Sequence, residues 1–515
     1  MNHQPDTADE PASEILASQA LAIANYIARG INHGCGDCVG LELEHFVVRR
    51  DNLAHVPYLD DPTSGATGVE SILERLAPLY DERVYETRSD GKRHLIGLSR
   101  PYANVTLEPG AQLEISIGPV FDIREIDVIY RDFRSELDPV LDDCGYRLLE
   151  LGYHPTASAH EIPLIPKNRY RLMDEHFKTT GRHGICMMRA TASTQVSIDY
   201  ASEADAVRKF RIANALGPLL AFITDNTPLF EGRPIGSGGT GPTGLAIPAR
   251  MARTAIWDDV DAARSMLAPH TFDEDFGFYS YASSVLQAPA IFTLEDDEDA
   301  QRPADKGDGV DSGENDGASV IGGSGVSSGV SSASDGDGVD NASDASGGSS
   351  ASDARANGKH NAWQGMRTFT DALAGHPLDR ATIEHVLSLF FFDVRFKTYI
   401  EIRMADSLPI DYALAFATLI KGLFYHEENL RQAEELLAHP EHPEPLNAAA
   451  IARAKAALQD AGYDAVVYGR PATEWLDTLI EMAQRALDAE ERSYLEPLAK
   501  LVAARATLAD EAQAR

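Results

Sequence analysis

The chain has 515 residues, a hydrophobic content of 43% and a formal net charge of −35 at pH 7. Such an acidic chain is unsuited to non-specific binding of nucleic acids or anionic membranes. The length allows one large enzyme domain with additional elements, or several smaller domains. No run of about 18 apolar residues occurs, and the polar, acidic first residues differ from a signal peptide. We therefore expect a cytoplasmic protein without a membrane span.

The N-terminal half is predicted to alternate helices with strands. Residues 1–10 are predicted to be a loose tail. Helices are predicted over Glu14–Arg29, Ser71–Tyr80, Asp122–Gly145 and about 202–225, with Ser202 a plausible N-cap of the last. The Gly-rich segment Gly232–Gly244 lacks the Gly-Lys-Ser/Thr ending of a P-loop, so we interpret it as a plain loop.

The four cysteines do not form a metal-binding pattern. Cys35 and Cys38 have the C-x-x-C spacing, but Cys144 and Cys186 are isolated, so no second pair completes a zinc site. We expect ordinary reduced thiols, and a regulatory disulfide is the alternative.

Four stretches alternate between polar and apolar residues, which is the period-two pattern of strands with one polar face. They are Val39–Val48, Asn104–Ile117, Met188–Tyr200 and Val394–Met404. Their polar faces gather acids, amides and arginines, including Glu42, Glu44, Glu108, Gln112, Glu114, Arg189, Arg395, Glu401 and Arg403. A sheet with one face in water alternates in the same way, but the polar faces of the first two stretches contain no Lys. We therefore expect one sheet that collects these acids on a single surface.

Crowded carboxylates favour a cation site. Glu42 and Glu44 would lie ~7 Å apart on one strand face. At an effective dielectric of ~20 their repulsion amounts to roughly 2–3 kcal/mol. Water and basic side chains could screen this repulsion, or divalent cations could occupy the space. Mg²⁺ takes carboxylate oxygens and commonly keeps waters and substrate phosphates as further ligands.

The composition changes sharply over residues 295–360, which are rich in Gly, Ser and Asp and poor in large apolar residues. Such a segment cannot bury enough surface to offset the entropy of ordering, so we expect it to be disordered. We interpret it as an insertion in one catalytic domain made of residues 11–294 and 361–410; the alternative is a linker between two domains. Residues 411–515 are predicted to be a helical region packed on that domain, with helices over Tyr412–Leu437, Pro445–Gly462, Pro471–Ala489 and Glu490–Ala512.

Several motifs together resemble those of a known family. They are Gly40–Phe46 (GLELEHF), Thr106–Ser116 (TLEPGAQLEIS), Met188–Asp199 (MRATASTQVSID) and Val394–Arg403 (VRFKTYIEIR), with further matches at Arg253–Trp257, Arg264, the Tyr281–Pro289 region, Gly422–Tyr425 and Tyr494–Pro497. Their order and spacing resemble glutamate–cysteine ligases of type 2, the branch shared by plants, proteobacteria and actinobacteria. The acidic insertion, the CysGlyAspCys element and Leu389–Phe392, in place of a Pro-containing turn, depart from the family pattern.

This resemblance implies an α+β fold of the glutamine-synthetase type, in which a curved antiparallel sheet forms a funnel with helices outside. It also implies a reaction that uses ATP and Mg²⁺ or Mn²⁺. The γ-carboxylate of glutamate would take the γ-phosphoryl group of ATP, and the amine of cysteine would displace phosphate to give γ-glutamylcysteine. Such a product belongs to glutathione or other low-molecular-weight thiol synthesis.

By motif match, five acids are assigned to Mg²⁺ and ATP: Glu42, Glu44, Glu108, Glu114 and Glu401. Arg189, Arg253 and Arg403 are candidates for the substrate carboxylate or the transferring phosphate, because a bidentate guanidinium suits planar oxyanions. Gln112 is a candidate for orienting a ligand or substrate. The alternative for Arg403 is a salt bridge to Glu401, and Trp257 is expected either in the pocket or in the core.

Three other functions fit the sequence. The first is a carboxylate–amine ligase that joins glutamate to another amine. The second is a catalytically silent metal- or nucleotide-binding regulator with the same scaffold. The third is a hub whose acidic tract binds basic proteins. For the ligase we expect only small-molecule partners (glutamate, cysteine and ATP), no nucleic acid and no membrane, and a homo-oligomer is compatible with the sequence.

Overall fold

The computed structural model describes residues 10–33, 36–87, 91–237, 244–291, 367–376, 378–438 and 445–514. The predicted insertion, the predicted tail before Glu10 and the centre of the Gly-rich segment lie outside these residues. None of the described helices is long and apolar enough to cross a bilayer.

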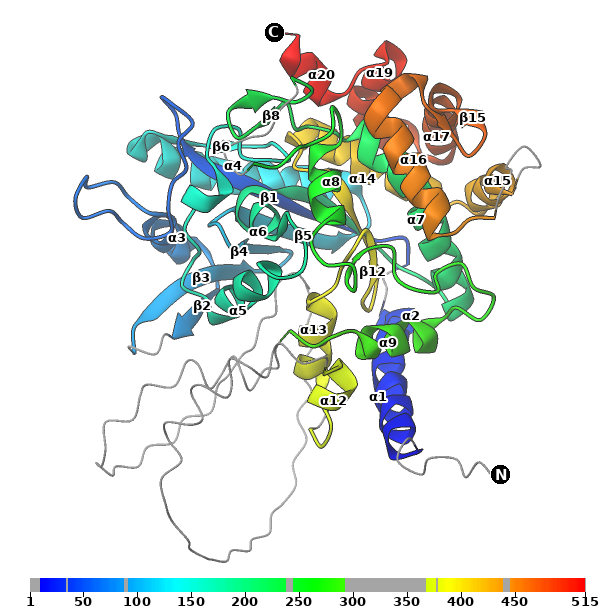
Figure 1. The fold of residues 1–515 in the computed structure, drawn as a ribbon. Helices are drawn as coiled ribbons and strands as arrows, with labels where there is room; N and C mark the ends of the chain where they lie inside the picture. The colour runs from blue at the N-terminus through cyan, green and yellow to red at the C-terminus, as the bar shows by residue number, and fades with distance from the viewer. Residues whose placement is uncertain are drawn as a thin grey trace, which may run out of the picture.

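An antiparallel sheet forms the centre of the molecule (Figure 1). Within the described residues it has nine strands in the order β12-β13-β7-β1-β5-β4-β3-β2, with β6 paired to β1 outside this order. The strands are β1 Val39–Arg49, β2 Glu82–Thr87, β3 Arg93–Arg100, β4 Ala103–Leu107, β5 Leu113–Val120, β6 Tyr146–Leu149, β7 Ser193–Ile198, β12 Val394–Phe396 and β13 Ile400–Asp406. The sheet is open, because β12 and β2 end it without pairing to each other. The predicted α+β class, with an antiparallel sheet and helices outside, is confirmed.

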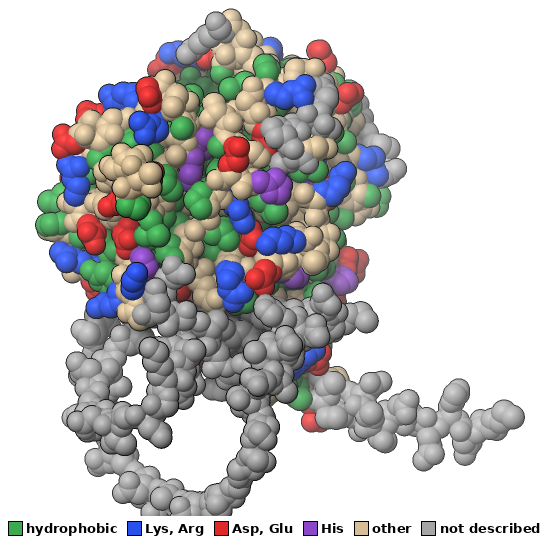
Figure 2. Space-filling model, turned by 60° about the vertical axis from the view of Figure 1, so that its left-hand side comes forward, with side chains coloured by type: hydrophobic (Ala, Val, Ile, Leu, Met, Phe, Trp, Pro, Cys, Tyr) green, Lys and Arg blue, Asp and Glu red, His purple; other side chains and the backbone are tan. Residues whose placement is uncertain are grey.

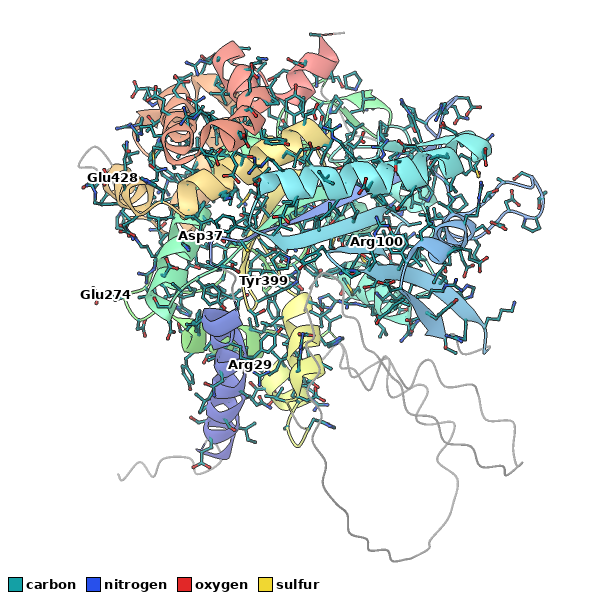
Figure 3. The ribbon with its side chains drawn as sticks, turned by 180° about the vertical axis from the view of Figure 1, so that it is seen from behind. Arg29, Asp37, Arg100, Glu274, Tyr399 and Glu428 are labelled. Carbon is teal, nitrogen blue, oxygen red and sulfur yellow. The ribbon has the colours of Figure 1, made fainter. Side chains whose placement is uncertain are left out.

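The two faces of the sheet differ as the alternation predicts. Leu41, Leu43 and Ile115 are buried on the apolar face, which is covered by α4 (Ile123–Cys144) and α14 (Ile410–Phe424). These two helices lie side by side across the strands in Figure 3. On the polar face, Glu42, Glu44, Glu114 and Gln195 are buried as well. The alternative of a face open to water therefore does not apply to these side chains.

Two helix ends follow directly from local sequence chemistry. The side chain of Asp122 accepts a hydrogen bond from the Arg124 amide at the start of α4, and Gly145 ends this helix with φ 73°. Ser202 caps α7 (Glu203–Ile223), as predicted, by accepting a hydrogen bond within the first turn.

The predicted strand Asn104–Ile117 is wrong as a single element, because it is a hairpin of β4 and β5. A tight turn over Glu108–Gln112 joins them, with the Glu108 amide donating to the Gln112 carbonyl at 2.9 Å. Pro109 and Gly110 favour a turn over a continuing strand. Glu108 therefore projects from the turn, whereas Glu114 stays on β5.

The other two predicted strands are also shorter than expected. Met188–Ala190 ends helix α6 (Gly184–Ala190), so Arg189 is a helical residue and the strand begins only at Ser193. The alternation MetArgAlaThr is too short to distinguish a strand from the end of a helix. Val394–Met404 is a hairpin in which the Lys397 amide donates to the Tyr399 carbonyl, so Arg395 pairs across it with Glu401.

The remaining elements surround the sheet. On the N-terminal side of the chain they are α1 Glu10–Ala28, α2 Gly30–His33, α3 Val69–Leu76, α5 Asn168–Phe177, α8 Ala252–Asp258, α9 Phe278–Gln287, α12 Phe369–Ala372 and α13 Arg380–Ser388, with the short pairs β8 Leu229–Phe230 with β9 Arg233–Pro234, and β10 Ser265–Met266 with β11 Phe391–Phe392. The predicted loop Gly232–Gly244 thus contains part of a small hairpin. Helices α1 and α9 pack together at the end of the molecule near the N-terminus (Figure 1).

The C-terminal region is helical, as predicted, but two of its predicted long helices are divided. Its further elements are α15 Glu427–Leu437, α16 Ala448–Ala461, α17 Ala472–Ala486, α18 Ala489–Tyr494, α19 Glu496–Ala504 and α20 Leu508–Gln513, with the pair β14 Val466–Val467 and β15 Arg470–Pro471. Arg505 ends α19 in a left-handed conformation, with φ 55°. On the face in Figure 2, acidic and basic side chains are interspersed with apolar ones.

The cysteines differ from the expectation in one respect. Cys38 is disulfide-bonded, so the prediction of reduced thiols is wrong for this residue, and Cys35 lies outside the described residues. Cys144 and Cys186 are free. The local spacing alone does not decide between a thiol and a disulfide.

Candidate active site

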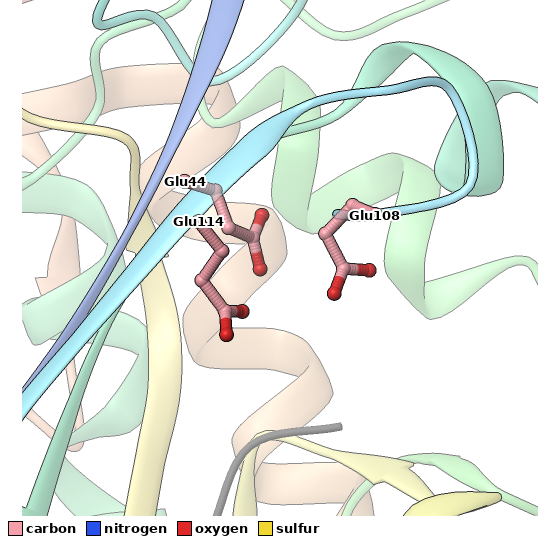
Figure 4. Close-up of side chains that lie close together, drawn as sticks. All are labelled: Glu44, Glu108 and Glu114. Carbon is pink, nitrogen blue, oxygen red and sulfur yellow. The ribbon is translucent and has the colours of Figure 1, made fainter. Parts of the chain in front are cut away.

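Three carboxylates converge on the polar face of the sheet (Figure 4). Glu44 on β1 lies opposite Glu114 on β5 in the strand register. Glu108 approaches them from the turn that precedes β5. One carboxylate oxygen from each of the three lies within 4.8 Å of the others. The pairing of β1 with β5 thus brings Glu44 close to two acids that lie 64 positions (Glu108) and 70 positions (Glu114) later in the sequence.

Neutral donors orient two of these carboxylates. The hydroxyl groups of Thr106 and Ser116 donate to Glu114 Oε1 at 2.8 and 3.0 Å. The Ser193 amide donates to Glu44 Oε2 at 2.7 Å, and Gln195 Nε2 donates to Glu44 Oε1 at 3.0 Å. Both carboxylates are thus fixed in position while their charge is not cancelled by a direct ion pair within the described residues.

The protonation of these acids reflects burial and mutual repulsion. Burial, and then the nearby Glu114 carboxylate, raise the pKa of Glu108 to about 8 and that of Glu44 to about 6. The same two causes, with Glu401 in addition, raise the pKa of Glu42 well above its ordinary value. Oxygen donors from clustered acids are the ligands that Mg²⁺ and Mn²⁺ take in proteins, so Glu44, Glu108 and Glu114 fit a divalent cation.

Glu42 lies on the same face of the sheet, next to Glu44 on β1 and opposite Gln195 on β7. Its side chain is buried, and its Oε2 atom has no hydrogen-bond partner among the described residues. A buried carboxylate oxygen without a partner is costly. Glu42 therefore has an oxygen free to accept a cation or a water.

Glu401 differs from the other acids because cations already surround it. Its two oxygens contact Arg395 at 2.6 Å, Lys397 at 3.0 Å and Arg403 at 2.8 Å. Although burial opposes it, the charges of Arg395, Lys397 and Arg403 hold the pKa of Glu401 far below its usual range. Glu401 is thus paired with three cationic side chains, and the predicted alternative of an Arg403–Glu401 salt bridge is present. The assignment of Glu401 to a metal ion stays a prediction.

The three predicted arginines occupy different environments. Arg189 on α6 donates to Asp174, with a closest distance of 2.6 Å, and to the Ile162 carbonyl. Arg253 is buried, and its guanidinium lies 4.9 Å from the centre of the Trp257 ring. Of these three arginines, only Arg403 lines the same cavity as the three carboxylates. The structure thus brings one of the three predicted arginines directly to the site.

Gln112 also lines the cavity, but its side chain is used internally. Its Oε1 atom accepts a hydrogen bond from the Gly110 amide at 2.8 Å, and its Nε2 atom donates to the Thr191 carbonyl at 2.8 Å. These contacts tie the turn that holds Glu108 to the segment between α6 and β7. Gln112 therefore fixes the position of Glu108.

The carboxylates face a cavity of about 90 Å³. This is well below the roughly 300–1,000 Å³ of sites that enclose a drug-sized ligand, so the cavity as it stands fits ions and small acid groups. Its wall is made of acids, arginines, amides, hydroxyl-bearing and apolar side chains: Glu44, Glu108, Pro109, Gln112, Glu114, Arg169, Tyr170, Met173, Met187, Met188, Thr191, Gln195, Trp257, Ser388, Phe391, Arg395 and Arg403. Trp257 therefore lines the cavity, which was one of its two expected positions.

Sequence reasoning assigned no site role to several of these polar residues, among them Arg169, Gln195 and Arg395. Gln195 and Arg395 lie on predicted polar strand faces, which could have indicated them. Arg169 lies on α5, where no motif or periodicity distinguished it. Its Nε atom has no hydrogen-bond partner among the described residues, and the same holds for Arg403 Nε. The two groups retain donors that suit an oxyanion.

The sequence matches the glutamate-cysteine ligase family 2 (GCS2) over residues 38–515. The chain belongs to this family. The chloroplastic glutamate–cysteine ligase of Brassica juncea is 26% identical over 448 residues, which are 85% of this chain and 70% of that protein. The chloroplastic enzyme of Arabidopsis thaliana is 29% identical over 295 residues, covering 56% of this chain and 52% of that protein. That of Nicotiana tabacum is 30% identical over 281 residues, covering 55% and 49%.

A solved structure to which this chain is similar is the glutamate–cysteine ligase (gshA) of Francisella tularensis in complex with AMP, with a TM-score of 0.42 and 12% sequence identity. The match covers 90% of this chain and 81% of that one. The predicted family is thus confirmed, from the family match and the plant relatives.

Proposed function

We propose that this family member joins the γ-carboxylate of glutamate to the amine of cysteine, with ATP and Mg²⁺ or Mn²⁺, to give γ-glutamylcysteine, ADP and phosphate. The observation that supports it most is the convergence of Glu44, Glu108 and Glu114 within 4.8 Å. Membership of the glutamate–cysteine ligase family supports the choice of substrates.

The chemistry explains why such a site is needed. A carboxylate is a poor electrophile because oxide would have to leave, so it is first converted into an acyl phosphate. A glutamate γ-carboxylate oxygen attacks the γ-phosphorus of ATP and ADP leaves. The amine nitrogen of cysteine then attacks the acyl carbon, phosphate leaves and the nitrogen loses a proton. A divalent cation, when bound, would neutralise charge on the phosphate oxygens.

The residues of the chain would supply position and charge for these steps. Glu44, Glu108 and Glu114 would hold the cation, and Glu42 offers a further oxygen nearby. The free donors of Arg169 and Arg403 suit the oxygens of the transferring phosphoryl group or of a substrate carboxylate. The apolar part of the wall, which includes Trp257, limits water around the reacting groups.

The test is phosphate release by the purified protein with ATP, Mg²⁺ and glutamate, across a panel of amines. We expect release that depends on cysteine, together with γ-glutamylcysteine as the product. Release only with other amines would favour a ligase with a different acceptor. Absence of release with every amine would refute the ligase proposal and favour a silent metal- or nucleotide-binding protein.

A further inference from the structure

Gln195 lies between Glu44, one of the three converging carboxylates, and Arg403, one of the cations around Glu401. Its Nε2 atom donates to Glu44 Oε1 at 3.0 Å and to Ser193 Oγ at 3.0 Å. Its Oε1 atom accepts a hydrogen bond from Arg403 Nη1. The side chain is 3% exposed. One neutral amide therefore bridges a buried carboxylate and a buried guanidinium.

The backbone places the amide at this point. Strand β7 is central in the sheet, with β1 on one side and β13 on the other. The register between β7 and β13 shifts between Ile402 and Ala405, which is a β-bulge that gives β13 one extra residue. The bulge contains Arg403, and bulges commonly re-aim a side chain. Arg403 is thereby directed to the amide of Gln195.

Glu44 and Glu401 show what the amide changes. Arg403 is close enough to lower the pKa of Glu44, yet among the described residues no ion pair joins the two. Glu401, in contrast, is contacted by three cations, one of which is Arg403. A carboxylate that accepts one neutral hydrogen bond on each oxygen keeps further lone pairs for a cation. Without the amide, Arg403 would have Glu44 as a second carboxylate partner.

We propose that Gln195 is a positioning residue that separates Glu44 from Arg403, keeping the carboxylate available to a divalent cation and the guanidinium available to a substrate oxyanion. This inference rests on the proposed function for the identity of the cation site. A neutral side chain thus prevents an ion pair from forming between Glu44 and Arg403.

The test is direct Mn²⁺ binding by isothermal titration calorimetry, without substrates, on the full chain. Gln195→Met keeps the length of the side chain but removes both hydrogen-bonding groups. We expect it to raise the Kd for Mn²⁺ by about tenfold or more, because Arg403 then pairs with Glu44. In an Arg403→Met background the same change should raise Kd by less than about threefold, since no guanidinium is left to pair.

Gln19→Met is the matched control, because Gln19 is also buried and donates to the Thr370 carbonyl far from the site. It should leave the Kd unchanged. Gln195→Leu serves as the second variant in both backgrounds, and circular dichroism checks the fold of each protein. The comparison with the Arg403→Met background decides the test, because a loss of Mn²⁺ affinity caused only by a disturbed fold would be the same with and without Arg403.

Two results would overturn the inference: an unchanged Kd in Gln195→Met, or an equal loss of affinity with and without Arg403. Failure of the wild-type protein to bind Mn²⁺ would remove the cation site and this inference together. Wild-type protein that binds Mn²⁺ but releases no phosphate with cysteine would refute only the proposed activity.

Discussion

Glu108 provides the sharpest test of the cation site, because its proton and the cation compete for the same carboxylate. Burial and the neighbouring Glu114 raise the pKa of Glu108 to about 8, and the pKa of Glu44 is about 6. A cation that binds below pH 8 must displace the proton from Glu108. Mn²⁺ affinity should therefore rise with pH, as metal binding to protonated ligands does.

The magnitude follows from these two values. Between pH 6 and pH 7, displacement of one proton with a pKa of about 8 changes the Kd by roughly tenfold, and Glu44 adds about a further factor of two. The variant Glu108→Gln keeps the shape of the side chain but has no proton to displace. The Kd of this variant for Mn²⁺ should change only about twofold between pH 6 and pH 7. At pH 8.5 its affinity should be at least about tenfold lower than that of the wild type, because one anionic ligand is lost.

The assay is Mn²⁺ titration by calorimetry at pH 6, 7 and 8.5, at constant ionic strength. Glu496→Gln is the control, because this acid is exposed, undergoes the same change in charge and forms an ion pair with Lys500 on α19. Its Kd and pH dependence should match those of the wild type. The same pH dependence in Glu108→Gln and in the wild type would refute the assignment of Glu108 as a ligand.

Three further sets of changes test the roles of Arg189 and Arg403, of His154, and of residues 300–358. Arg189→Met should lower the free energy of unfolding by about 2–4 kcal/mol, because the buried Asp174 loses a partner, and it should change kcat/KM little. Arg403→Met should lower kcat/KM by about 100-fold. The opposite pattern in the two variants would contradict both assignments. Burial lowers the pKa of His154 to about 3, so below about pH 6.5 the unfolded chain binds a proton that the folded chain excludes. The free energy of unfolding should therefore fall by about 1.4 kcal/mol per pH unit because of this residue. Urea unfolding at pH 6 and pH 5 should show a smaller change of this free energy with pH in His154→Leu than in the wild type. Replacing residues 300–358 with a short Gly/Ser bridge should preserve cysteine-dependent phosphate release, and a folded but inactive product would show a catalytic or regulatory role of this segment.

The described residues on either side of residues 300–358 lie close together. The Ala290 amide donates to the Arg367 carbonyl at 2.9 Å, and Pro289 and Thr368 form an isolated antiparallel bridge. The two flanks therefore lie side by side, so a short connection can join them without distortion. Loop closure over few residues costs little additional free energy.

Much of the site follows from the sequence because alternation is a local property. Successive residues of a strand point to opposite faces, so Glu42 and Glu44 had to share one face of β1, whatever surrounds them. Helix caps are local as well, and Asp122, Gly145 and Ser202 end or begin helices as their chemistry predicts. The family could be named from the motifs for the same reason, since each motif is a short run of residues.

What the sequence left open depends on contacts between distant segments. The polar face of β1 predicts an acid cluster, but only the register with β5 sets Glu44 opposite Glu114, and only the turn at Pro109 brings Glu108 beside them. Glu401 and Glu44 both lie on the polar face of a strand, but their neighbours differ. The hairpin of β12 and β13 gives Glu401 three cationic neighbours, whereas Gln195 gives Glu44 a neutral one. Charge compensation acts through space over a few ångströms, so tertiary packing decided which acids remain free to bind a cation.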